Sequence, residues 1–443
     1  MKVLKSYDVK KWLVFGLPIL AMCLIMACSK KENDSIDDVG NPDDDPAPET
    51  MTFTSFSPVE GERGSTLELT GTNFSTTPSE NTVTFGTAGG AVTDATSTLL
   101  TVTVPDNATS GTITVSTGTT TVTSTDEFEV YEPAKWTQVT SYPNEEGRTL
   151  GISFTINGII YSGLGSTSDH LTEHEIWSYD PNLDSWDQRA DFLNTEDKLT
   201  GSTVFIINNK AYVIGGSKND EDSSEVWEYN PNVGQGGTWT LMDTPFPGSG
   251  KKRATGFSIN GKGYVVGGGY FNGEFTQEVD EVWMYDPIDD SWTVKMGFPG
   301  PAFTRGLGFV VDDKAYVHLG RTEKAGDGNG SNEFWEYTPS NDSWIEKASF
   351  SGKRSGAFGF AIDDKVYLGY GATYDQNQQT SIKYQDFIVY NPIDNSWTDL
   401  INPEGVTESS GAIGLSVNGV GYMGLGSGDT SDTFWKFEPR KKL

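Results

Sequence analysis

Five arginines at related positions in the C-terminal two thirds of the chain have the clearest potential for chemistry. They are Arg148, Arg253, Arg305, Arg321 and Arg354. Arg253 and Arg305 share one offset, four residues before a phenylalanine, whereas Arg148 and Arg354 lie six residues before one. A guanidinium group presents paired, planar donors that match a carboxylate. Because the chain has a formal net charge of −31, such a cationic cluster would stand out and favour an acidic ligand.

Aromatic side chains near these arginines would add a second kind of ligand contact, since a ring face can stack on a ligand. The candidates are Tyr270, Phe271, Tyr370 and Tyr374. The alternative is structural: the arginines form salt bridges at a rim with acids nearby in the chain. Those acids are Glu145, Glu146, Glu274 and Glu323. The sequence leaves both alternatives open.

Two further patterns resemble parts of metal sites. His170-Leu-Thr-Glu-His174 has a zinc-like spacing, but such ligands meet only on a helix and the surrounding pattern predicts a loop. Asp327-Gly-Asn-Gly-Ser331 alternates oxygen ligands as calcium loops do, yet Thr338 stands where such a loop ends in glutamate. We therefore expect no cofactor and no metal site, with room only for weak calcium binding.

The elements that position these side chains belong to a repeat of about fifty residues. Six tyrosines mark it: Tyr161, Tyr212, Tyr264, Tyr316, Tyr367 and Tyr422. Before each tyrosine, a two-residue turn of Asn, Asp or Gly predicts a hairpin, because these residues tolerate positive φ. Two tryptophan-containing segments after it predict a third and a fourth strand. Four strands per repeat are typical of a propeller blade.

This pattern resembles the kelch repeat, whose blades carry a diglycine after the second strand and then a tyrosine and a tryptophan. The resemblance covers about residues 134 to 443, although the full diglycine occurs only at Gly215-Gly216 and Gly267-Gly268. It implies a six-bladed propeller in which the aromatic residues pack between blades. It also implies that the loops carrying the five arginines surround the mouth of the propeller axis.

The ends of the repeat region indicate how the propeller closes. The sixth repeat lacks a tryptophan after Pro439 and so lacks a fourth strand. Trp136-Thr-Gln-Val139, upstream of the first repeat, has the missing pattern. Pairing the two ends would hide two exposed strand edges. We expect a propeller domain over 133–443, closed by this N-terminal strand.

The preceding segment, 51–132, alternates apolar and polar residues in short runs separated by Gly, Pro and Asn, as half-buried strands do. Its pattern around Pro58, Gly71, Phe74, Phe85 and Phe128 resembles the immunoglobulin-like IPT/TIG domain. The expected fold class is therefore all-β, a sandwich followed by a propeller. With no cluster of charged or aromatic residues, we expect the sandwich to act as a spacer.

The first 27 residues combine four lysines with a 16-residue apolar run, which predicts a removed signal peptide. Ala27-Cys28 resembles the lipoprotein box, so we expect Cys28 to be lipidated, as with palmitate. Residues 28–50 are rich in Asp and Pro and read as a disordered tether. Lysines followed by acids resemble the export signal of Bacteroidetes-like surface lipoproteins. The expected location is the outer membrane, lipid-anchored and facing the cell surface, with the periplasmic face as the alternative.

Two functions follow from these expectations. The first is a non-catalytic surface module that binds a glycan or a protein. The alternative is a sugar mutarotase or epimerase similar to the six-bladed kelch enzyme acting on sialic acid. We favour binding, because spacing identifies no acid–base pair and this fold hosts many non-enzymes. The negative charge argues against nucleic acid as a partner.

Overall fold

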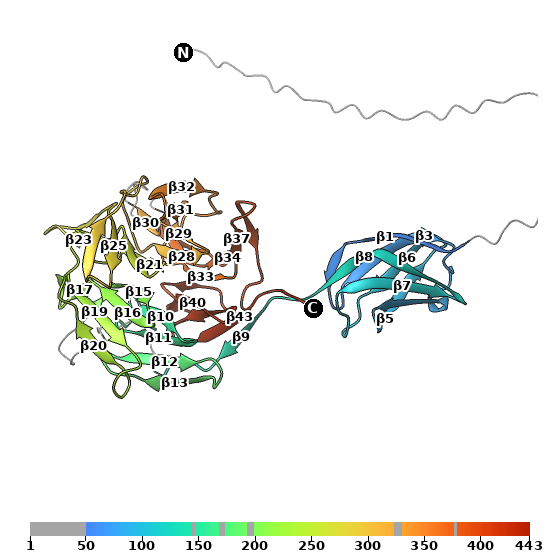
Figure 1. Ribbon diagram of the computed structural model, residues 1–443, viewed down its shortest axis with the longest axis horizontal. Coiled ribbons are helices and arrows are strands. Elements are labelled where there is room, and N and C mark those ends of the chain that lie inside the picture. The colour runs from blue at the N-terminus through green and yellow to red at the C-terminus, as the bar shows by residue number, and fades with distance from the viewer. Residues whose placement is uncertain (1–49, 144–146, 168–172, 193–198, 323–329, 376–378) are drawn as a thin grey trace, which may run out of the picture. The chain divides into compact units, whose positions relative to one another are not determined.

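The computed structural model describes residues 50–143, 147–167, 173–192, 199–322, 330–375 and 379–443 (Figure 1). Within these ranges the chain is built of β-strands and one short 3-10 turn, Pro78–Glu80. None of the described segments is an apolar helix of membrane-spanning length. Several residues named above lie outside the described ranges: the signal segment 1–27, Cys28, Glu145, Glu146, His170, Glu323, Asp327 and Asn329.

The N-terminal part is a sandwich whose strands have the predicted period of two. They are β1 (Thr52–Ser57), β2 (Glu60–Glu62), β3 (Thr66–Thr72), β4 (Asn81–Phe85), β5 (Ala88–Ala95), β6 (Leu99–Thr103), β7 (Gly111–Thr117) and β8 (Thr120–Glu132). Their order is β1-β3-β6-β5-β4-β7-β8-β2. Leu67 and Leu69 of β3 face Leu100 and Val102 of β6 in a core fully shielded from solvent. Alternating burial thus gives the sandwich its single core.

The described repeats form six four-stranded antiparallel sheets, the blades of a propeller (Figure 1). Their strands are, blade by blade, β10 (Ile152–Ile156), β11 (Ile159–Gly163), β12 (Ile176–Asp180), β13 (Ser185–Gln188); β15 (Thr203–Ile207), β16 (Lys210–Ile214), β19 (Val226–Asn230), β20 (Thr238–Leu241); β21 (Thr255–Ile259), β22 (Lys262–Val266), β25 (Val282–Asp286), β26 (Ser291–Val294); β28 (Leu307–Val311), β29 (Lys314–His318), β31 (Phe334–Thr338), β32 (Ser343–Lys347); β33 (Phe358–Ile362), β34 (Lys365–Gly369), β37 (Phe387–Asn391), β38 (Ser396–Asp399); and β40 (Ile413–Val417), β41 (Val420–Gly424), β43 (Phe434–Glu438), β9 (Lys135–Val139). The first strand of each blade contacts the first strands of both neighbours, so these six strands surround the axis.

The propeller closes as predicted, with an N-terminal strand in the sixth blade. Strand β9 pairs antiparallel with β43, with Trp136 opposite Phe437. The Trp136 ring lies 5.0 Å from Phe437 and 5.0 Å from Phe387 of the preceding blade. Its Nε1 donates to the carbonyl oxygen of Ile401 at 2.9 Å. The closing strand therefore joins the last two blades by ring packing as well as by main-chain pairing.

The last residues leave the propeller and join the sandwich. β44 (Lys441–Lys442) pairs antiparallel with β8, with Lys441 opposite Glu132. The Arg440 guanidinium lies 3.8 Å from the centre of the Tyr131 ring, and Leu443 packs against the sandwich core. These residues were expected to belong to the propeller segment 133–443, but their main-chain partners lie in the sandwich.

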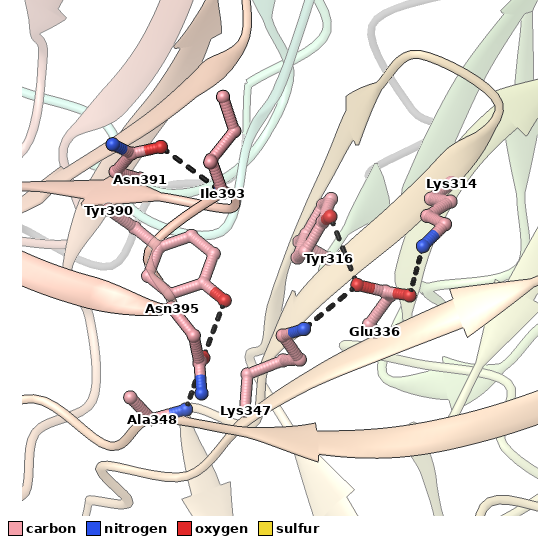
Figure 2. Close-up of polar contacts among 9 residues, drawn as sticks. All are labelled: Lys314, Tyr316, Glu336, Lys347, Ala348, Tyr390, Asn391, Ile393 and Asn395. Atoms are coloured by element: carbon pink, nitrogen blue, oxygen red, sulfur yellow. Dashed lines mark hydrogen bonds and ion pairs between the residues drawn. The ribbon is translucent and has the colours of Figure 1, made fainter.

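Polar contacts of the repeated aromatics tie each blade to the one before it. In the fifth blade, Tyr390 donates to Oδ1 of Asn395 at 2.8 Å, and the same oxygen accepts the backbone N–H of Ala348 at 2.9 Å (Figure 2). The tyrosines of three other third strands donate in the same way, to Asp184, Asp290 and Asp342. The repeated aromatics are therefore scaffold, which agrees with the packing role predicted for them.

Glu336 is the most deeply buried carboxylate among these contacts, with 3% of its surface exposed. Lys314 donates to it at 2.6 Å and Tyr316 at 3.1 Å (Figure 2), and Lys347 lies 3.2 Å away. Burial alone would raise the pKa of Glu336, but the hydrogen bonds from the two lysines outweigh it. The pKa therefore lies below its ordinary value of 4.5.

Glu336→Gln is expected to lower the free energy of unfolding by about 1–3 kcal/mol at neutral pH, because it removes a charge-assisted pair. The folded-state pKa is depressed, so this stabilisation is present above the unfolded value near 4.5 and is lost as the pH falls through the folded value. Urea unfolding of both proteins from pH 7 to pH 3 measures this. The difference between them should shrink at the acid end. A constant difference would contradict the ionic role, and the exposed Glu346→Gln is the matched control.

Candidate functional site

A cavity of about 420 Å³ opens at the end of the propeller axis where the chain enters each first strand. We call it the axial mouth. Residues of all six blades line it, among them Leu150, Gly201, Arg253, Arg305, Gly356 and Gly411. A second cavity of about 530 Å³ continues between the first strands and shares Ser153, Ser202 and Gly306 with the mouth. A ligand bound at the mouth could therefore extend into the second cavity.

The six residues just named occupy one repeated position, four residues before the large apolar residue of each first strand. All have positive φ: Leu150 59°, Gly201 68°, Arg253 57°, Arg305 59°, Gly356 65° and Gly411 68°. Backbone hydrogen bonds connect neighbours around the mouth, from Gly201 to Leu150, Arg253 to Gly201, Arg305 to Arg253 and Gly411 to Gly356. Glycine suits this geometry, whereas a residue with a Cβ adopts it at a cost of about 1–2 kcal/mol.

Arg253 and Arg305 therefore occupy strained positions, which is typical of residues with a functional role. In the described part of the chain neither side chain makes an ion pair or a hydrogen bond. The pKa of Arg305 is lowered to about 10, first by desolvation and then by the charges of Arg253 and Arg321. The pKa of Arg253 is also lowered, mainly by desolvation and then by Arg321. Although solvent screens the exposed Arg305 in part, this local repulsion favours binding of an anion.

Arg321 lies close to Arg253 and Arg305. It lies in β30 (Arg321–Thr322), which pairs with β27 (Phe303–Thr304), directly before Arg305. Its Nε lies 3.7 Å from Oε1 of Glu278, a buried carboxylate at the end of β24 (Thr276–Glu278). Oε1 of Glu278 also accepts a hydrogen bond from Thr304 at 3.1 Å. Arg321 is thus close enough to add positive potential at the mouth, but it is paired.

Arg148 and Arg354 are buried ion-pair residues. Arg354 is fully buried and donates from Nη1 and Nη2 to the Asp386 carboxylate at 2.8 Å each. Arg148 is 4% exposed and donates to Oε2 of Glu175 at 3.2 Å. Both arginines form ion pairs, as the structural alternative expected, but the guanidinium groups are buried rather than at a rim and the partners are other acids than those expected. Arg354 does not line the mouth, and its guanidinium is fully paired, so a ligand-binding role is not supported for it. Arg148 lines the mouth, but Glu175 already pairs with its guanidinium.

The three tyrosines expected to stack on a ligand are scattered. Tyr370 is fully buried and donates to the carbonyl oxygen of Val406 at 3.1 Å; its predicted stacking role is wrong, because it stands at a diglycine position with φ 59° and packs between strands. Tyr374, in β35 (Ala372–Asp375), is 44% exposed and does not line the mouth. Tyr270, in β23 (Gly269–Phe271), lines a separate cavity.

The histidines do not form a metal site in the described residues. His318 is fully buried and its pKa is lowered to about 3, mainly by desolvation, so it is neutral. Nε2 of His174 lies 3.7 Å from Asp191. In the ranges that the structure describes, no three His, Cys, Asp or Glu side chains are grouped as metal ligands.

Sequence reasoning missed the hydroxyl groups of the mouth. Thr149, Ser153, Ser202, Ser355, Ser410 and Ser427 line it on blades 1, 2, 5 and 6, the four blades that carry neither Arg253 nor Arg305. Serine and threonine are common throughout this chain, so their type carried no signal. Aligning the repeats would have found the ring, because glycine recurs at the offset that Arg253 and Arg305 share.

Comparisons with known proteins agree with the division into an N-terminal sandwich and a propeller. The IPT/TIG domain matches residues 51–130, and the Kelch motif matches residues 198–244 and 251–297. Alpha-scruin of Limulus polyphemus is 31% identical over 120 residues, which are 26% of this chain and only 12% of that protein. The solved structure of YjhT has a TM-score of 0.55 and 16% identity, covering 69% of this chain and 99% of that one. The chain therefore combines an IPT/TIG domain with a six-bladed kelch β-propeller closed by an N-terminal strand.

Proposed function

We propose that the propeller binds a glycan bearing a carboxylate at the axial mouth, and that it does so without catalysis. The observation that carries this proposal is the pair Arg253 and Arg305, held in a strained backbone conformation and without a partner in the described residues. A carboxylate would accept from both guanidinium groups and relieve their mutual repulsion.

The four blades of the mouth without these arginines support a sugar over a simple anion. Thr149, Ser355 and Ser427 already donate to backbone carbonyl oxygens, so they can still accept from sugar hydroxyl groups. Ser153 and Ser410 can donate as well as accept, which suits a pyranose ring. Gly151, Gly306 and Gly414 line both the mouth and the cavity that continues from it. Calorimetric titration with N-acetylneuraminic acid and D-glucuronic acid tests the proposal. We expect at least one of the two acids to bind and its neutral parent sugar not to bind. If neither acid binds, the proposed function is wrong.

The alternative is an isomerase acting on an acidic sugar. Among the described residues that line the mouth, none is a carboxylate or an imidazole that could move a proton. This lining favours binding. NMR of the α and β anomers decides between the two: we expect the protein to leave their interconversion rate unchanged, whereas acceleration would establish an enzyme.

We also propose that Cys28 carries a lipid and anchors the protein in the outer membrane. The basis is the sequence alone: four lysines, an apolar run and a small residue before the cysteine. Cys28→Ala should block processing or release the protein from the membrane fraction, since no acyl chain could be attached. Fractionation with detergent partitioning measures this, with Cys28→Ser as a second variant. Unchanged partitioning of both variants would contradict the anchor.

A further inference from the structure

A third cavity, of about 310 Å³, lies on the loops of blades 2 and 3. We call it the hairpin cavity; Asp222, Ser249, Lys251, Tyr270 and Phe271 line it. It is formed by the segment β17–β18 (Ser217–Lys218, Glu221–Asp222) and by the hairpin of β23 and β24. The bridge between Lys252 and Gly269 joins this hairpin to the residue next to Arg253. Lys251 of this cavity is therefore two residues from Arg253 of the axial mouth, although the two cavities share no lining residue.

Two of the lining residues, Asp222 and Phe271, have fixed contacts before any ligand arrives. Lys252, which does not itself line the cavity, has its Nζ 2.8 Å from Asp222, and the Phe271 backbone N–H donates to the same carboxylate. The Lys252 ammonium also lies 5.6 Å from the centre of the Phe271 ring. Yet Phe271 is 55% exposed, so a large aromatic surface is held in place and left uncovered. Such an arrangement lowers the entropy lost when a ligand binds.

This combination of groups suits a sugar ring. An aromatic face packs on the C–H face of a pyranose, while Lys251 and Ser249, which also line the cavity, carry donors for its hydroxyl groups. Asp222 is already paired with Lys252, so the uncovered Phe271 ring is the main contact that the cavity offers, and an aromatic face suits a neutral sugar unit. The Asp222 charge also reaches the mouth, where it raises the pKa of Arg253 against the larger opposing effects of desolvation and Arg321.

We infer that the hairpin cavity is a second sugar subsite, which holds the neutral unit next to the acidic unit in the axial mouth. The ligand is then an oligosaccharide with an acidic terminal unit. This inference rests on the proposed function of the mouth and adds chain length to its specificity.

Calorimetry with matched short and long sugars tests the subsite. N-acetylneuraminic acid is compared with 3′-sialyllactose, and D-glucuronic acid with a hyaluronan tetrasaccharide. For the wild type, the longer sugar should bind about three- to tenfold more tightly, as one added aromatic contact provides. Phe271→Ala should abolish this gain and leave the affinity for the monosaccharide unchanged. Phe275→Ala is the matched control: Phe275 is equally exposed on the same hairpin but does not line the cavity.

The outcomes separate the two proposals. A wild type that binds the monosaccharide but gains nothing from extension overturns the subsite and leaves the function of the mouth intact. A gain that survives Phe271→Ala, or that Phe275→Ala removes equally, also overturns the subsite. A wild type that binds none of the four sugars overturns the mouth as a site for acidic sugars, and the subsite with it.

Discussion

The double substitution Arg253→Gly and Arg305→Gly is expected to weaken the binding of acidic sugars by at least about a hundredfold. Each arginine provides a charge-assisted contact that contributes about 1.5–3 kcal/mol. This double substitution should stabilise the propeller, whereas a substitution in the scaffold would destabilise it. Both positions have the positive φ that glycine adopts freely.

The free energy of unfolding is expected to increase by about 0.5–1 kcal/mol per site, after subtracting the effect of the greater entropy that glycine gives the unfolded chain. Removing two like charges should increase it further. Urea unfolding and calorimetric titration with N-acetylneuraminic acid on the same preparation measure both effects. Alanine at both sites is a useful comparison, because it removes the guanidinium groups and keeps the backbone strain.

Leu150→Gly is the matched control, because Leu150 occupies the same repeated position with φ 59° and carries no charge. It should stabilise the protein by a similar amount. Leu150 lines the mouth but offers no polar group, so its replacement should change sugar affinity far less than the double variant does. If the double variant still binds acidic sugars, the ligand site lies elsewhere. If it is strongly destabilised, the two arginines are structural residues and the electrostatic argument for a carboxylate fails.

Deleting Lys135–Val139 is expected to produce the largest loss of stability. The deletion leaves β43 with an exposed edge and removes Trp136 from between the last two blades. Removing a packed tryptophan alone costs about 3–5 kcal/mol, and the lost main-chain pairing adds to this. Thermal unfolding followed by near-ultraviolet circular dichroism, which reports on the packed aromatic rings, measures the effect.

Point substitutions make this prediction sharper, because a deletion also shortens the connection to the sandwich. Trp136→Ala should account for much of the loss, whereas Gln138→Ala, exposed on the same strand, should change little. An unchanged melting temperature for the deletion would show that the sixth blade does not depend on β9. Equal effects of the two point substitutions would show that ring packing does not hold the closure.

Local signals in the sequence were sufficient for the fold. The residues Asn157, Asn260 and Asn418 begin hairpin turns and have the positive φ that their type tolerates. The turn and the aromatic residues recur in every repeat, so each blade specifies itself within about fifty residues. Closure followed from counting strands. The one element that this reasoning misplaced, β44, is short and pairs with a strand some three hundred residues earlier.

The candidate site was predictable only in part. The sequence by itself determined that Arg253 and Arg305 share an offset from the first strand, and therefore one height at the mouth. It could not determine that Arg354, two positions earlier in its repeat, points into a buried pair with Asp386, or that Tyr370 is fully covered. An offset of two residues changes which groups surround a side chain, and those groups come from distant parts of the chain. Periodicity reveals position along a strand, whereas charge neutralisation and burial depend on neighbours that only the folded propeller brings together.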